Sequence, residues 1–339
     1  MQLTDFHFDV PPELIAQRPA EPRDSARLMV LERATGTIRH HVFRDLPDLL
    51  APEYVVVVNN SRVIKARLAP RRASGDVFDL FLLRALAPMR WLCLGDALAM
   101  PEPGETLTFA DSAMTTELVE RRDDGTVVFE FANVPDVLAE VERIGRLPLP
   151  PYITEQGHEA GYQTVYAQEP GSVAAPTAGL HFTPEVFERL AARGIGREEV
   201  TLHVGYGTFA RVQHEDLTQH VMHSEAFELD HETAERLNAH KHSGRKLLAV
   251  GTTATRTIES CADDAGRLVA RSGETALFIR PPYRYKAVDA LLTNFHMPGF
   301  TPIMLVAAIA GYELTMRAYQ EAIAQRYRFY SFGDAMLIL

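Results

Sequence analysis

The pattern of hydrophobic and polar positions divides the chain into two kinds of segment. Residues 54–58, Tyr-Val-Val-Val-Val, form a continuous β-branched run that is typical of a strand inside a sheet. Elsewhere, short apolar runs separated by glycine turns cover residues 77–83, 91–94, 106–109 and 127–131. Many short strands at such spacing are typical of a small barrel or sandwich. We therefore predict a small all-β domain over 69–149, inserted into a larger domain made of 1–68 and 150–339.

The larger domain shows alternating helix and strand patterns. Thr183-Pro184-Glu185 is typical of a helix start, Gly194 can end that helix, and Asp230 can cap another. Strands are predicted over residues 199–204, 246–250 and 275–279, and two closing helices over 301–311 and 313–325. Such alternation predicts an α/β sheet. The expected fold class is therefore α/β and multi-domain: a large mixed α/β domain with an inserted small all-β, barrel-like domain.

Composition narrows the class of protein. With 46% hydrophobic and 23% charged residues, the chain is typical of a globular protein. Two cysteines, Cys93 and Cys261, are too few for a disulfide framework or a multi-cysteine zinc site. The longest apolar run, 303–310, is much shorter than the ~20 residues of a membrane span, and the N-terminus lacks a signal-peptide core. We expect a soluble, cytoplasmic protein that makes no membrane contact.

The net charge of −11 argues at first against a nucleic-acid partner. However, residues 69–149 alone carry 8 basic and 14 acidic residues, which is more than half of the deficit. Lysine occurs only four times among the 34 basic residues, so arginine dominates, and arginine pairs bidentately with phosphate and stacks on bases. Arginines and aromatics interleave in 280–286 and 326–330. We therefore expect any RNA contact to be local and arginine-led.

Three glycine-containing segments are candidates for chemistry. Residues 251–256, Gly-Thr-Thr-Ala-Thr-Arg, follow a predicted strand and open a helix, which could be an anion cradle or an ordinary N-capped helix. Residues 171–183 are rich in small, uncharged residues and contain His181. Residues 203–209, His-Val-Gly-Tyr-Gly-Thr-Phe, follow a predicted strand. The last segment lacks the third glycine of a dinucleotide fingerprint. These segments predict turns that a ligand can approach closely.

Imidazoles and a carboxylate also cluster in the sequence. His220, His223 and Glu225 lie within six residues, a spacing that allows either metal ligation or acid–base chemistry. We favour the acid–base interpretation because a strand context need not make the three side chains converge. Residues 293–296, Thr-Asn-Phe-His, form a further polar and aromatic loop.

Longer motifs carry a family resemblance across most of the chain. They are Ala-Gln-x-Pro at 16–19, Arg-Asp-x-x-Arg-Leu at 23–28, Asn-Asn-Ser-Arg-Val-Ile-Lys-Ala-Arg at 59–67, His-Ser-Glu at 223–225, Asn-Phe-His at 294–296, and the segments 162–167, 171–182, 201–209, 251–256 and 330–338. Together they resemble the S-adenosylmethionine:tRNA ribosyltransferase-isomerase family of the queuosine pathway. The resemblance is weakest in the inserted segment.

The resemblance implies transfer and isomerisation of the ribosyl group of S-adenosylmethionine. The acceptor is 7-aminomethyl-7-deazaguanine at the wobble position in a tRNA anticodon stem-loop, and the products are epoxyqueuosine-tRNA, adenine and methionine. S-adenosylmethionine is a co-substrate, and no prosthetic group or metal is implied. The chain is expected to act as a monomer.

On this basis we assign hypothetical roles to residues of the matching motifs. His181, His203 and His223 are candidate bases or acids, and Glu225 orients them or balances the sulfonium charge. The substrate-binding set is Arg27, Asn59, Arg62, Arg67, Thr177, Gly205, Gly207, Thr208, Gly251, Thr252, Thr253, Arg256, Asn294 and His296. The tRNA-binding set is Arg280, Tyr283, Arg284 and Arg328. Two alternatives stay open at this point, namely a metal-dependent hydrolase built on His220, His223 and Glu225, and a non-catalytic RNA-binding protein.

Overall fold

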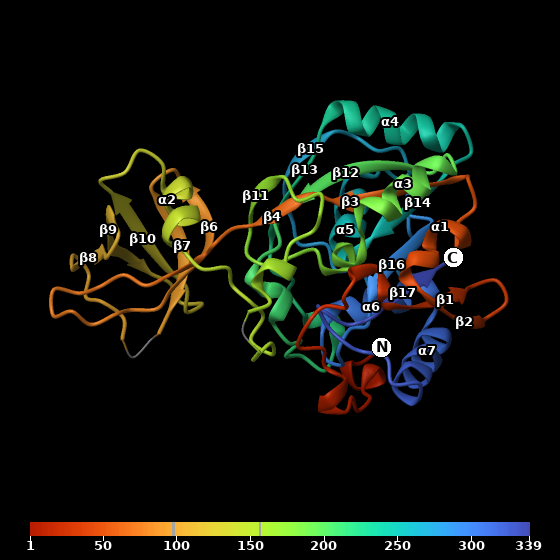
Figure 1. Ribbon diagram of the computed structural model, residues 1–339, viewed down its shortest axis with the longest axis horizontal. Coiled ribbons are helices and arrows are strands. Elements are labelled where there is room, and N and C mark those ends of the chain that lie inside the picture. The colour runs from red at the N-terminus through yellow and green to blue at the C-terminus, as the bar shows by residue number, and fades with distance from the viewer. Residues whose placement is uncertain (97–98, 156) are drawn as a thin grey trace. The chain divides into compact units, whose positions relative to one another are not determined.

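The computed structural model describes residues 1–96, 99–155 and 157–339, and its chain forms two compact units (Figure 1). The large unit consists of Met1–Ser61, Pro151–Glu169 and Ala175–Leu339. The small unit consists of Arg62–Pro150 and Pro170–Ala174. The large unit is mixed α/β and the small unit is mainly antiparallel β, so the predicted fold class is confirmed.

A nine-stranded mixed sheet in the described residues forms the centre of the large unit, in the order β15-β13-β12-β3-β14-β16-β17-β1-β2. Its strands are β1 (Arg27–Glu32), β2 (Thr37–Val42), β3 (Tyr54–Asn59), β12 (Gly196–Leu202), β13 (Glu225–Leu229), β14 (Lys246–Val250), β15 (Arg271–Thr275), β16 (Ala290–Asn294) and β17 (Ala335–Ile338). The four strands β12, β3, β14 and β16 run parallel to one another. Every residue of β3 is buried, as expected for a parallel strand covered on both faces.

Helices pack around this sheet. They are α1 (Leu46–Leu49), α3 (Pro184–Ala192), α4 (His231–His242), α5 (Gly251–Cys261), α6 (Thr301–Ala310) and α7 (Tyr312–Ala324). The predicted caps are confirmed, because the Thr183 hydroxyl accepts a hydrogen bond from the Val186 N–H and the Asp230 carboxylate accepts one from the Thr233 N–H. Helix α5 packs directly on β12, β3, β14 and β16. In the part of the chain that the structure describes, no helix has the length and apolar character needed to span a bilayer.

Short 3₁₀ helices connect many of these elements. They are η1 (Leu3–Phe6), η2 (Pro12–Leu14), η3 (Arg23–Ser25), η4 (Phe43–Asp45), η5 (Glu159–Gly161), η6 (Thr177–His181), η7 (Tyr206–Phe209) and η8 (Leu217–Gln219). The helix η6 packs against β16 and α5. Its neighbour Phe182 joins Val58 and Leu292 in one hydrophobic core, so the small-residue loop predicted from the sequence is anchored on the sheet.

The small unit contains a six-stranded antiparallel sheet in the order β5-β6-β7-β10-β9-β8. These strands are β5 (Arg67–Leu68), β6 (Leu80–Ala87), β7 (Arg90–Gly95), β8 (Thr106–Phe109), β9 (Ser112–Arg121) and β10 (Val127–Ala132). Helix α2 (Val137–Ile144) follows, and Val141 packs with Trp91, Leu107 and Phe129 in the core of the unit. Two further strands, β4 (Ser61–Val63) and β11 (Glu169–Ser172), pair with each other.

One predicted strand is wrong. The apolar run at 275–279 indicated a strand, but β15 ends where that run begins, at Thr275. The strand β15 is an exposed edge strand that pairs antiparallel with β13 through its backbone, from Glu225↔Thr275 to Leu229↔Arg271. Because an edge strand can pair without burying its side chains, its polar sequence gave no apolar signal.

Candidate active site

The carboxyl ends of the four parallel strands meet at one edge of the sheet. His203 follows β12, Asn59 ends β3, Gly251 follows β14 and Asn294 ends β16. After β3, the next strand of this sheet in the chain, β12, pairs with one side of β3, and a later strand, β14, pairs with the other side. The strand order therefore changes direction at β3. In open α/β sheets, ligands bind at the carboxyl ends of the strands beside such a point. The sheet therefore brings four of the predicted site residues to the edge where a ligand is expected.

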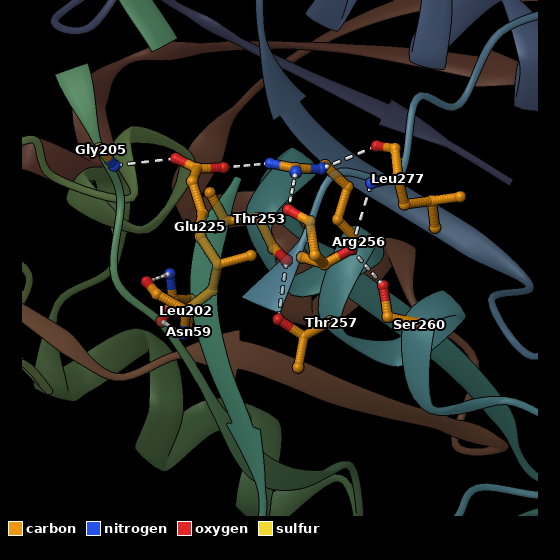
Figure 2. A network of polar contacts seen from close by, with 10 residues as sticks. Asn59, Leu202, Gly205, Glu225, Thr253, Arg256, Thr257, Ser260 and Leu277 are labelled. Atoms are coloured by element: carbon orange, nitrogen blue, oxygen red, sulfur yellow. Dashed lines mark hydrogen bonds and ion pairs between the residues drawn. The ribbon is translucent and has the colours of Figure 1, made fainter. Parts of the chain in front are cut away.

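Asn59 ties the ends of β3 and β12 together (Figure 2). The side chain is fully buried. Its Oδ1 accepts hydrogen bonds from the Leu202 N–H at 3.0 Å and the Ser61 N–H at 3.1 Å, and its Nδ2 donates to the Leu202 carbonyl at 2.9 Å. With its amide engaged by the backbone on both sides, Asn59 fixes the geometry of the sheet edge.

A buried ion pair lies at the same edge (Figure 2). Glu225, the first residue of β13, is only 6% exposed, and its Oε1 accepts a hydrogen bond from the Gly205 N–H at 2.8 Å. Its Oε2 contacts Nη1 of Arg256, which is also 6% exposed. The other guanidinium nitrogens of Arg256 donate to the Thr275 and Leu277 carbonyls, each at 3.0 Å. Arg256 therefore holds the Glu225 carboxylate in place instead of standing free as an anion-binding group.

The N-terminus of α5 presents small polar residues beside this pair. Gly251 takes a left-handed backbone with a φ of +85°, which lets the chain turn sharply from β14 into the helix. In the described chain the Thr253 hydroxyl is buried without a hydrogen-bond partner, and Thr252 is half-buried next to it. Thr177 begins η6, which packs on this helix. Free N–H groups at a helix N-terminus attract anions, so this turn can bind a carboxylate.

His181 ends η6 in a buried position. The side chain is 4% exposed and its ring lies 5.0 Å from that of Phe43. Its Nε2 has no hydrogen-bond partner among the residues that the structure describes. Burial lowers the pKa of His181 to about 4, and the Asn294 side chain opposes that shift. The imidazole is therefore neutral at pH 7, and its conjugate acid is a strong proton donor.

This buried imidazole gives the protein a specific acid sensitivity. The pKa of His181 lies below the ~6.5 of an unfolded histidine, so between these values only the unfolded state binds the proton. The contribution of His181 to the free energy of unfolding is therefore fully present above pH ~6.5. It falls by about 3 kcal/mol as the pH drops toward 4. We expect His181→Gln to lose about 3 kcal/mol less than the wild type between pH 7 and 4, as measured by urea unfolding. An equal loss in both proteins would contradict this prediction.

The other two candidate histidines are connected to Glu225 in different ways, His203 through its backbone and His223 through its position in the chain. His203 donates its backbone N–H to the Ala226 carbonyl at 2.8 Å, next to Glu225. Burial lowers the pKa of His203, while the charges of Glu169 and Glu228 oppose this shift. His223 is exposed, and its ring is packed against the backbone of Gly207. His223 thus lies beside Glu225 in the chain, whereas the carboxylates that act on the His203 ring are those of Glu169 and Glu228.

The close approach of His223 to Gly207 predicts a sharp difference between two neighbouring glycines. A Cβ atom at Gly207 would lie 2.5 Å from the His223 ring, whereas one at Gly205 would lie 3.7 Å from the nearest atom of Glu225. We expect Gly207→Ala to displace the imidazole and to lower the release of adenine from S-adenosylmethionine, the reaction that the family resemblance implies, at least tenfold. Gly205→Ala is the matched control and is expected to retain most of the activity. Equal activities of the two variants would contradict this placement of His223.

Several predicted binding residues are engaged by other groups. Arg27 lies 3.7 Å above the Tyr327 ring, and Arg328 contacts Asp334. In the small unit, Arg62 pairs with Glu142 at 3.0 Å and Arg67 pairs bidentately with Asp79. Thr208 lies within η7, and Asn294 donates to the Tyr330 and Ser331 carbonyls. The His296 Nε2 lies 2.9 Å from the Thr293 hydroxyl, and burial lowers the pKa of His296 to about 3.

A buried carboxylate that sequence reasoning missed binds the loop that carries the predicted tRNA-binding residues Arg280, Tyr283 and Arg284. Glu259 in α5 is 3% exposed. It accepts hydrogen bonds from the Tyr283 hydroxyl and from the N–H groups of Lys286, Ala287 and Val288, at 2.9–3.0 Å. Arg284 is exposed on the same loop, and Arg280 lies beside Phe278. A lone glutamate on a helix gives no sequence signal for this role.

The arrangement does not support a metal centre on His220, His223 and Glu225. Both Glu225 oxygens are engaged, one by the Gly205 N–H and the other by Arg256. Over residues 1–96, 99–155 and 157–339, no group of three or more His, Cys, Asp or Glu side chains is arranged to hold a metal ion. The site therefore favours proton transfer and charge compensation.

A mixed α/β sheet with buried acid–base groups at the carboxyl ends of its parallel strands is typical of an α/β enzyme. The model of the queuosine biosynthesis protein family matches residues 3–338 of this chain. The S-adenosylmethionine:tRNA ribosyltransferase-isomerases of Symbiobacterium thermophilum and Desulfitobacterium hafniense are 52% and 48% identical to it, and each match covers 100% of both chains. The crystal structure of an S-adenosylmethionine tRNA ribosyltransferase from Thermotoga maritima is 38% identical, with a TM-score of 0.57 over 99% of this chain and 100% of that one. The chain belongs to the queuosine biosynthesis protein family.

Proposed function

We propose that this chain transfers and isomerises the ribosyl group of S-adenosylmethionine onto 7-aminomethyl-7-deazaguanine at the wobble position of tRNA. The products are epoxyqueuosine-tRNA, adenine and methionine. The relatives from Symbiobacterium thermophilum and Desulfitobacterium hafniense align with this chain over their full length, and they carry the name of that activity. The chain is thus a transferase that uses S-adenosylmethionine and tRNA as substrates in queuosine biosynthesis. We further propose that it is a cytoplasmic monomer and requires no prosthetic group.

The buried Glu225 carboxylate is the observation that carries this proposal for the site. S-adenosylmethionine has a sulfonium cation, and its departure as methionine neutralises that charge. A carboxylate fixed at the sheet edge by Gly205 and Arg256 can attract the cation electrostatically, without ligating it and without reorganising. The carboxylate of the methionine part of S-adenosylmethionine would bind to the N–H groups at the start of α5 and to Thr252 and Thr253.

Proton transfer is assigned to the three histidines. The 5′ carbon beside the sulfonium loses an acidified proton to a base, and adenine needs a proton when it leaves. His223 lies two residues before Glu225, and the His203 backbone bonds to the neighbouring Ala226. Burial lowers the pKa of His203, which suits a base at pH 7. His181 is more deeply buried, so its protonated form would readily release a proton to a leaving base.

The proposed roles are tested by adenine release. The wild-type chain is incubated with S-adenosylmethionine and a tRNA that carries 7-aminomethyl-7-deazaguanine, and free adenine is measured by chromatography. We expect release to require both substrates. Alanine variants at His181, His203, His223 and Glu225 are expected to lose most of this activity. Full activity in all four variants would overturn the assignment of the site, while failure of the wild type to release adenine would overturn the proposed function.

A further inference from the structure

Three aromatic residues outside the hydrophobic core lie together in the large unit. The rings of Tyr152 and Tyr330 stack with centroids 4.0 Å apart and planes inclined by 14°. The Phe300 ring packs edge-on against Tyr330, with centroids 6.0 Å apart and planes inclined by 82°. Each of the three residues keeps part of its surface open to solvent. We refer to Tyr152, Phe300 and Tyr330 as the aromatic platform.

The backbone of Tyr330 is held in an unusual conformation. Its φ is +71°, in the left-handed region that a tyrosine seldom adopts. Three hydrogen bonds fix it there: its N–H donates to the Phe295 carbonyl at 3.0 Å, and its carbonyl accepts from Asn294 Nδ2 and from the Gly333 N–H, each at 2.9 Å. Since Phe329 is fully buried while Tyr330 is not, this turn brings one ring of the segment out of the core.

The partner ring and the strand end are fixed as well. The Tyr152 hydroxyl lies 2.5 Å from the Ser331 hydroxyl, which orients the ring that stacks on Tyr330. Asn294, which holds the Tyr330 carbonyl, ends β16 at the carboxyl edge of the parallel strands. The aromatic platform is therefore a preorganised surface at the same sheet edge as Glu225.

The side chain of Arg211 lies beside the aromatic platform. Arg211 is exposed, and its guanidinium carbon lies 5.7 Å from the centroid of the Phe300 ring. Its positive charge also acts on Tyr330, where it opposes the burial that raises the pKa of that hydroxyl to about 12. Within the described residues Arg211 makes no ion pair with a carboxylate. The guanidinium is thus available to an external anion.

We infer that the aromatic platform stacks a base of the RNA substrate that lies next to the modified nucleotide, with Arg211 on an adjacent phosphate. The inference rests on the proposed function, in which tRNA is the acceptor. Aromatic rings beside arginine bind single-stranded RNA because every base has a π face and each nucleotide carries a phosphate. S-adenosylmethionine has an adenine but no phosphate, and its one carboxylate is assigned to the start of α5, so it would leave Arg211 without a partner. The position of Arg211 thus favours an RNA base over the adenine of the co-substrate.

The test compares Tyr330→Leu with Tyr330→Phe and with Phe8→Leu. Tyr330→Leu removes the stacking ring, and Tyr330→Phe restores it. Phe8→Leu is the matched control because it removes a half-buried ring that packs on Tyr319, away from the aromatic platform. We expect Tyr330→Leu to raise the KM for tRNA about tenfold. Its KM for S-adenosylmethionine is expected to stay within about twofold of the wild-type value, and the other two variants are expected to keep the wild-type KM for tRNA.

A binding measurement keeps this inference separate from the proposed function. An anticodon stem-loop with 2-aminopurine beside the wobble position is titrated with each protein, and thermal unfolding checks that each variant is folded. Quenching of the fluorescence by the wild type and Tyr330→Phe, and its loss in Tyr330→Leu, would support stacking even if no adenine were released. Equal quenching by Tyr330→Leu, or a raised KM for S-adenosylmethionine with an unchanged KM for tRNA, would overturn the inference.

Discussion

Replacing Glu225 by glutamine is expected to lower adenine release at least 100-fold and the free energy of unfolding by about 3 kcal/mol. The Glu225 carboxylate accepts hydrogen bonds from both the Gly205 N–H and the Arg256 guanidinium. A glutamine can accept only one of them, because its NH₂ group would face the other donor. The buried Arg256 would lose its counter-charge, and the sulfonium would lose the proposed fixed anion. Turnover with S-adenosylmethionine and the precursor-bearing tRNA, together with urea unfolding, measures both effects.

Two further variants separate the chemical role of Glu225 from its structural role. Glu235→Gln makes the same change on the exposed face of α4 and is expected to alter neither quantity. The double variant Glu225→Leu/Arg256→Met removes both buried charges, so its stability should return to within about 1 kcal/mol of the wild type. Its adenine release should stay as low as that of Glu225→Gln. Recovery of activity in the double variant would show that the carboxylate serves only to neutralise Arg256.

Replacing Glu259 by glutamine is expected to have the second largest effect, a loss of about 3 kcal/mol in the free energy of unfolding. Each Glu259 oxygen accepts two hydrogen bonds, from Tyr283 and Lys286 on one side and from Ala287 and Val288 on the other. A glutamine can keep one pair of bonds, but its amide group would face two buried donors on the other side. We also expect the KM for tRNA to rise, because this loop carries Arg284.

Tyr283→Phe is the control for this prediction. It removes one of the four hydrogen bonds to Glu259 and leaves the three backbone donors in place. The expected loss is therefore only about 1 kcal/mol, measured by the same urea unfolding. If both variants lost the same small amount of stability, Glu259 would not be the group that holds the loop.

The sequence predicted those parts of the fold whose side chains are buried or whose ends are capped. The strands β3 and β14 are continuous apolar runs, and Thr183 and Asp230 make the helix caps that their positions indicated. The edge strand β15 was misplaced because its stability comes from backbone pairing with β13. In the same way, the long strand β9 was missed because its polar residues alternate without forming an apolar run.

The site was only partly predictable for a different reason. Motif residues such as His181, Glu225 and Asn294 were identified, and the sheet brings strands far apart in the chain to one edge. The partners of those residues depend on tertiary structure. No local spacing shows that Arg256 pairs with Glu225, 31 positions earlier, instead of meeting an external anion. The aromatic platform also draws its rings from three distant segments, and its central ring requires a φ at Tyr330 that no sequence pattern predicts.

The proposed reaction transfers the ribosyl group of S-adenosylmethionine and leaves its methyl group on methionine. A double-label experiment tests this claim most directly. S-adenosylmethionine labelled with tritium in the methyl group and with carbon-14 in the ribose is incubated with the protein and the precursor-bearing tRNA. We predict that carbon-14 enters the tRNA in a one-to-one ratio with released adenine, while tritium stays with free methionine. Tritium in the tRNA, or carbon-14 that remains with adenine, would contradict the account.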